Sequence, residues 1–71
     1  MIDSPNKHKL FLLGLSNSQL EEFAVSHGES SFRGRQLYDW IYNKGVQKID
    51  NITVLPKSWR IQLSEKGISL G

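Results

Sequence analysis

The sequence predicts an all-α fold, a small bundle of three to four short helices. Apolar residues recur at helical spacing in the segments 20–24 and 37–41, and they do not alternate as they would in a strand. Serines that can cap a helix precede these segments, and glycines that can end a helix follow them. With 71 residues, the chain is long enough for one domain of modest stability.

A first helix is predicted to begin near Asn17. Ser16 and Gln19 have the spacing of a capping box, in which each side chain accepts a hydrogen bond from a backbone N–H at the helix start. Gly28 can adopt the left-handed conformation that ends a helix, so we expect a helix of about ten residues. Its predicted buried stripe is Leu20, Phe23 and Ala24.

A second helix is predicted from about Arg33 to Asn43, with Ser30 or Ser31 as its cap and Gly45 after its end. Gly34 lies in the first turn, where glycine is a poor helix former, and this favours the close approach of another backbone. The residues predicted to face the core are Leu37, Trp40 and Ile41, with the indole at the centre of that face.

The remaining chain predicts a short helical turn and a last helix. Apolar residues at three-residue spacing favour a turn capped by Asp50, followed by a helix that begins at Pro56 and closes at Gly67. Trp59 and Leu63 share one face of that helix. The spaced apolar residues of the turn are Val46, Ile49, Ile52 and Leu55.

These elements define one helical domain over residues 10–67. Residues 1–9 are polar, contain Pro5 and show no period, so we expect a flexible N-terminal arm. Residues 68–71 are expected to have no structure of their own and to begin a linker.

Composition excludes several classes of function. The chain has no cysteine, so it holds neither a disulfide nor a cysteine-ligated metal or cluster. Its longest early apolar run, residues 10–13, is far shorter than the roughly 20 residues of a membrane span. We therefore expect a cytoplasmic protein with no membrane partner. The net charge of +2 is unevenly distributed, since residues 32–71 carry seven basic side chains against three acidic ones.

No set of residues with the spacing of a catalytic or metal site stands out. No carboxylate lies three or four residues from His8 or His27, and both histidines are expected to be solvated surface residues. Adjacent Glu21 and Glu22 point about 100° apart on a helix and favour a solvated face. The sequence predicts no catalytic residue and no metal ligand.

A basic and aromatic surface remains as the candidate site. Arg33 and Arg35 begin the second helix, where backbone N–H groups also suit a phosphate, and Lys44 and Lys48 flank its end. These charges also fit a second interpretation, in which they only keep a small domain soluble. Tyr38 and Tyr42 are four residues apart and can stack on exposed bases, or lie at the edge of the core or at a docking surface.

The segment 32–46, Phe-Arg-Gly-Arg-Gln-Leu-Tyr-Asp-Trp-Ile-Tyr-Asn-Lys-Gly-Val, closely resembles the N-terminal part of the radical-SAM adenine-C2 RNA methyltransferases. That family modifies large-subunit ribosomal RNA and transfer RNA. The match continues through residues 49–57, and upstream residues 13–16, followed by Leu20 and Phe23, resemble the family's opening helix. The resemblance covers about residues 10–67. Gly34 stands where the family pattern leads us to expect alanine.

The resemblance implies a helix-hairpin-helix-like accessory domain whose catalytic barrel is absent from this chain. In such enzymes the [4Fe–4S] cluster and S-adenosylmethionine are held by the barrel, so the resemblance implies a methyltransferase parent and no catalysis or cofactor here. The partners it implies are structured rRNA and tRNA, together with the protein's own catalytic domain, and the isolated domain is expected to be a monomer. Four residues match basic positions of that accessory domain, and we predict that they contact phosphate: Arg33, Arg35, Lys44 and Lys57.

Three functions compete at this point. The favoured one is an RNA-docking domain that recognises shape and backbone. The second is a structural brace or lid that packs on the catalytic barrel without touching RNA. The third, a free-standing DNA-binding domain, is weaker because no helix carries several base-reading polar side chains.

Overall fold

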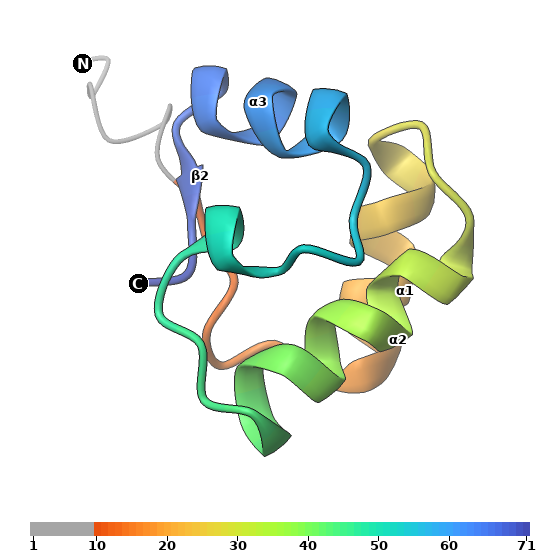
Figure 1. The fold of residues 1–71 in the computed structure, drawn as a ribbon. Coiled ribbons are helices and arrows are strands. Elements are labelled where there is room, and N and C mark those ends of the chain that lie inside the picture. The colour runs from red at the N-terminus through yellow and green to blue at the C-terminus, as the bar shows by residue number, and fades with distance from the viewer. Residues whose placement is uncertain (1–9) are drawn as a thin grey trace, which may run out of the picture.

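The structure, a computed structural model, describes residues 10–71 and confirms the all-α class (Figure 1). The arm predicted for residues 1–9 lies outside the described residues. The described range contains three α-helices, two short helical turns that both lie between the second and the third helix, and one pair of two-residue strands. The α-helices are α1 (Asn17–Ser26), α2 (Ser31–Tyr38) and α3 (Lys57–Glu65).

Helix α1 has the predicted bounds and the predicted capping box. Ser16 Oγ accepts a hydrogen bond from Gln19 N at 3.2 Å, and Gln19 Oε1 accepts one from Ser16 N at 2.8 Å. The helix is ten residues long, and Gly28 follows it with φ +89°. Its buried residues are the predicted ones, Leu20, Phe23 and Ala24.

Helix α2 packs against α1 through Gly34, as its position in the first turn predicted. A Cβ atom built on Gly34 would lie 2.5 Å from Glu21 N and would also collide with Leu20 O. Because these atoms belong to the backbone of α1, the two helix backbones are in direct contact at this point. This contact fixes how closely α1 and α2 approach each other.

The second helix does not continue as a regular α-helix to Asn43. Residues Asp39–Asn43 form the π-helical turn η2, and Lys44 N donates to Asp39 O at 3.1 Å, five residues back. A π turn is wider than the 3.6 residues of an α-helical turn, so the 100° spacing assumed from the sequence does not hold beyond Tyr38. The prediction that Trp40 lies at the centre of the core face was wrong, because Trp40 is only half-buried at the edge of the core.

The segment before α3 contains the predicted short turn. Residues Ile49–Asn51 form the 3₁₀ turn η3, in which Asp50 is the second residue and not the cap. The three-residue apolar spacing holds, since the side chains of Ile49, Ile52 and Leu55 are buried. Pro56 occupies the N-cap position of α3.

The expectation that residues 68–71 have no structure was wrong for residues 68–70. Strand β2 (Ile68–Ser69) pairs in parallel with β1 (Leu10–Phe11), and Leu12 N and Leu13 N donate to the carbonyls of residues 69 and 70, each at 2.9 Å. Ile68 and Leu70 are 7% and 4% exposed. These residues are ordered because their side chains are buried in the core, which the sequence reading assigned to the helices alone.

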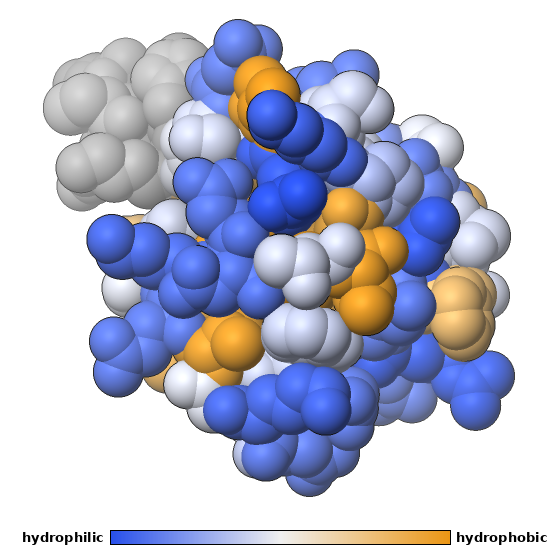
Figure 2. Space-filling model, in the orientation of Figure 1, coloured by the Kyte–Doolittle hydropathy of each residue, from blue (hydrophilic) through white to orange (hydrophobic). Residues whose placement is uncertain are grey.

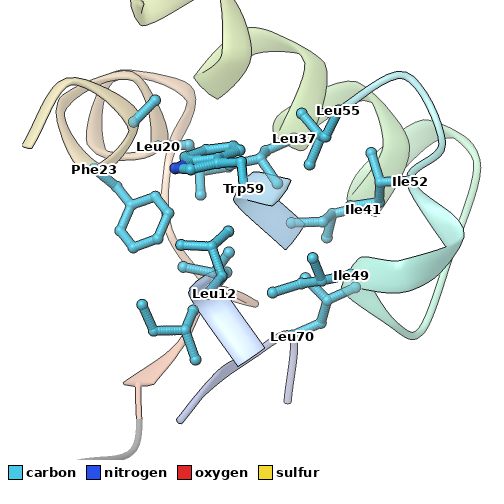
Figure 3. Close-up of a cluster of buried hydrophobic side chains, with 13 residues drawn as sticks. Leu12, Leu20, Phe23, Leu37, Ile41, Ile49, Ile52, Leu55, Trp59 and Leu70 are labelled. Atoms are coloured by element: carbon cyan, nitrogen blue, oxygen red, sulfur yellow. The ribbon is translucent and has the colours of Figure 1, made fainter. Parts of the chain in front are cut away.

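The core is built around Trp59, which is 3% exposed (Figure 3). Its Nε1 donates to His27 O at 3.1 Å, so the indole joins α3 to the end of α1. The ring of His27 lies 4.2 Å from that of Phe23, between centroids, and Nδ1 is 2.9 Å from Phe23 O. His27 is therefore half-buried, and its predicted solvated position was wrong. His8 lies outside the described residues.

Candidate functional site

Arg33, predicted to contact phosphate, is held by three groups of the protein. Its guanidinium lies 3.4 Å from Glu29 Oε1 and donates to Gln36 Oε1 at 2.8 Å and to Val54 O at 3.2 Å. The side chain is 27% exposed. These contacts tie α2 to the loop before α3, so the geometry gives Arg33 a structural role.

Arg35 lies apart from Arg33. Its side chain is 68% exposed, and Nε lies 3.9 Å from Glu21 Oε2 on α1. Arg33 contacts the loop that leads to α3 and Arg35 contacts α1, so the two guanidinium groups point to different sides of α2. The structure does not bring them together around one phosphate. An exposed ion pair at this distance contributes at most about 1 kcal/mol, so Arg35 can leave Glu21 for another anion.

Lys44 lies at the opposite end of this helical segment. Its Nζ is 5.3 Å from the centroid of the Trp40 ring, a cation–π arrangement on the surface. Arg33 lies in the first turn of α2, whereas Lys44 follows the π turn η2 at the other end of the segment. Lys57, the fourth predicted contact, is exposed at the first residue of α3.

Tyr38 and Tyr42 stack on each other at the surface, with ring centroids 4.8 Å apart and planes inclined by 47°. The Tyr42 hydroxyl accepts a hydrogen bond from Gly14 N at 2.6 Å and donates one to Leu15 O at 3.1 Å. Tyr42 therefore fixes the loop between β1 and α1, which agrees with its interpretation as a core-edge residue. The two residues remain 36% and 40% exposed.

Lys48 and Arg60 are basic residues that the sequence analysis did not include among the four predicted phosphate contacts, although it placed Lys48 on the basic surface. Both line a surface groove between η3, the end of α3 and β2, with a cavity volume of about 320 Å³. They are twelve residues apart and belong to different elements, so no local spacing signals their proximity. Only the packing of α3 beside η3 brings them to one groove.

The described surface carries basic and aromatic side chains suited to binding. Residues 10–71 contain no cluster of three histidine, cysteine or acidic side chains able to hold a metal ion. None of the helices in this range is both long and apolar enough for a membrane crossing. The face in Figure 2 is mostly hydrophilic, and apolar residues reach its surface in separate small areas.

Comparison with known proteins agrees with this description. Residues 10–68 match the family model described as the ribosomal RNA large subunit methyltransferase N-terminal domain. A Prochlorococcus marinus protein named probable dual-specificity RNA methyltransferase RlmN is 62% identical over 64 residues, which cover 90% of this chain and 18% of that protein. A Synechococcus sp. protein of the same name is 58% identical over 60 residues, which cover 84% of this chain and 17% of that protein.

The chain thus spans less than a fifth of the length of these relatives. The match to the family model covers the helices, both helical turns and the start of β2. This chain belongs to the family of ribosomal RNA large subunit methyltransferase N-terminal domains.

Proposed function

We propose that this chain is the RNA-docking, non-catalytic N-terminal domain of a radical-SAM methyltransferase that acts on adenine C2 of large-subunit rRNA and tRNA. The observation that carries the proposal is family membership, because the similar proteins are named as RNA methyltransferases. Supporting it, the half of the chain from residue 32 onward is basic, and Arg35, Lys44 and Lys57 are exposed there.

The chemistry of methyl transfer belongs to the rest of the protein in this proposal. An iron–sulfur cluster of the radical-SAM type needs cysteine thiolates, and this chain has none. Its residues therefore do not fit a [4Fe–4S] cluster, and residues outside this chain would hold it together with S-adenosylmethionine. The part left to this domain is to position structured RNA through its phosphates, in a cytoplasmic enzyme.

A salt series on the isolated chain tests RNA docking. We expect a fluorescently labelled RNA hairpin to bind at low salt. The logarithm of its association constant should fall linearly with the logarithm of the salt concentration. The double variant Arg35→Gln, Lys57→Gln should reduce the salt slope by about two, while Arg35→Lys, Lys57→Arg, which keeps both charges, should leave it unchanged. A wild-type chain that binds no RNA at about 50 mM salt would exclude the proposal.

A second function, a brace that packs on the catalytic domain, is favoured by one observation. Leu13 is 60% exposed and borders a groove of about 510 Å³ whose apolar side includes Val46 and Leu70. If the catalytic part of the parent covers this groove, adding that part in trans should raise the melting temperature of the domain. Leu13→Ser should abolish the increase, and an unchanged melting temperature with the wild type would exclude the brace.

A further inference from the structure

The groove that contains Lys48 and Arg60 has the features of a phosphate site. The residues that line it belong to η3, α3 and β2, which follow one another in the chain, and to the segments that flank them. Two basic residues line it, together with Ser64 and Ser69, whose side chains carry hydroxyl groups. Ammonium, guanidinium and hydroxyl groups are donors that suit a phosphate oxygen.

Arg60 lines this groove, and most of its N–H donors make no hydrogen bond within residues 10–71. Its Nη1 donates to Asp50 O at 2.8 Å, the one hydrogen bond that Arg60 makes within the described residues. Its Nε is buried and has no hydrogen-bond partner in residues 10–71. A carbonyl oxygen orients the side chain and leaves its full charge uncompensated, so the guanidinium is held in place for an anion.

Charge balance distinguishes this groove from the arginines of α2. Arg33 and Arg35 each lie within 4 Å of a glutamate, so part of their charge is already compensated. Neither Lys48 nor Arg60 forms an ion pair within the described part of the chain, although Asp50 also lines the groove. Two basic side chains against one acidic side chain leave a positive lining. Among residues 10–71, no side-chain carboxylate is bound to Lys48 or Arg60 that an incoming phosphate would have to displace.

We propose that the groove between Lys48 and Arg60 binds a backbone phosphate of the RNA that this domain docks. The inference rests on the proposed function for its ligand and deepens it by naming a contact point. Lys48 is exposed and supplies the ammonium from the loop before η3, while Arg60 supplies a fixed guanidinium from α3. Because both groups recognise phosphate and not a base edge, the contact orients RNA without selecting its sequence.

The test measures binding of a labelled RNA hairpin to the 71-residue chain by fluorescence anisotropy. Because Gly71 lines the groove, the chain is prepared with an amidated C terminus, which keeps a terminal carboxylate out of it. We expect Lys48→Ala to weaken binding about fivefold and to reduce the salt slope by about one, and Lys48→Glu to weaken it more than tenfold. Lys66→Ala removes the same charge at an exposed position outside the groove and serves as the matched control.

Arg60→Lys and Arg60→Gln extend the test, with melting temperatures to show that each variant folds. We expect Arg60→Gln to bind more weakly than Arg60→Lys, since only the latter keeps the charge. If the wild type binds RNA and Lys48→Glu binds equally well, the groove is not the contact and the proposed function stands. If the wild type binds no RNA, both proposals fail.

A second experiment, with inorganic phosphate, distinguishes a site for RNA from a site for a free small anion. Phosphate at millimolar concentration should compete weakly with RNA and shift the amide signals of Lys48 and Ser69 in an NMR titration. If free phosphate binds at micromolar concentration while RNA binding does not depend on Lys48, the groove is a small-anion site and the inference is overturned.

Discussion

The backbone of Glu21 lies directly against Gly34, and no side chain separates α1 from α2 at this point. Larger residues at position 34 would have to push the helices apart, which would also move Leu20 and Leu37 in the core below. Gly34 therefore lowers the helix propensity of α2 but allows α1 to pack closely against it. A glycine in a helix costs about 1 kcal/mol relative to alanine, and the short distance between the helices compensates for that cost here.

Gly34→Ala should destabilise this chain despite the better helix propensity of alanine. Overpacking costs about 1–3 kcal/mol, and the propensity gain of about 1 kcal/mol offsets only part of it. Gly34→Val should cost more because the added volume is larger. Urea unfolding followed by tryptophan fluorescence measures both changes. An alanine variant more stable than the wild type would mean that α1 and α2 can separate at little cost.

Tyr42→Phe should lower the free energy of unfolding by about 1–2 kcal/mol, because it removes a hydroxyl bonded to both Gly14 N and Leu15 O. Tyr38→Phe is the matched control, since the Tyr38 hydroxyl makes no hydrogen bond within the described residues. Both variants keep their rings, so RNA binding through stacking should survive in each. Equal stability of the two variants would contradict the structural role of the Tyr42 hydroxyl.

Ser16→Ala should cost about 1 kcal/mol, because Ser16 caps α1 through its hydroxyl. Ser30 occupies the same N-cap position of α2 without a side-chain hydrogen bond, so Ser30→Ala should change stability by less than about 0.5 kcal/mol. Thermal melts of the two alanine variants give a direct comparison. A larger loss for Ser30→Ala would contradict this assignment of the caps.

Leu70→Ala should destabilise the domain by about 2–5 kcal/mol, since Leu70 is 4% exposed and belongs to the core. Leu13→Ala changes the same residue type at a position that is 60% exposed and should cost under about 1 kcal/mol. Denaturant unfolding of the pair tests whether the last residues are part of the folded domain. Similar small losses would indicate that residues 68–70 pack only loosely.

Local signals in the sequence were sufficient for much of the helical framework. The capping box of Ser16 and Gln19, the stop at Gly28 and the close approach at Gly34 each depend on a few neighbouring residues, and each is confirmed. The pairing of β1 with β2 depends on residues 58 positions apart and on burial in a shared core, so no local pattern reveals it. Trp40 was misplaced because the π turn at Asp39 changes the helical angle.

The candidate site was less predictable than the fold. Sequence position suggested that Arg33 and Arg35 act together, but Glu29 and Glu21 hold them on different sides of α2. The charge of a side chain can be read from sequence, whereas its partners depend on the packing of several elements. Whether Arg35, Lys44 and Lys57 contact RNA stays a prediction until binding is measured.

The parallel pairing of β1 and β2 also has a mechanical consequence. Leu10 lies opposite Ile68 and Phe11 opposite Ser69, so the incoming and outgoing chains leave the strand pair at opposite ends. Tension applied to the two flanks would slide one strand along the other, and the bonds from Leu12 N and Leu13 N would resist it together. When two strands are sheared, their hydrogen bonds are loaded together, and the pair resists pulling better than one whose bonds break one at a time. The strand pair would therefore carry the tension between the two flanks and protect the helices from it.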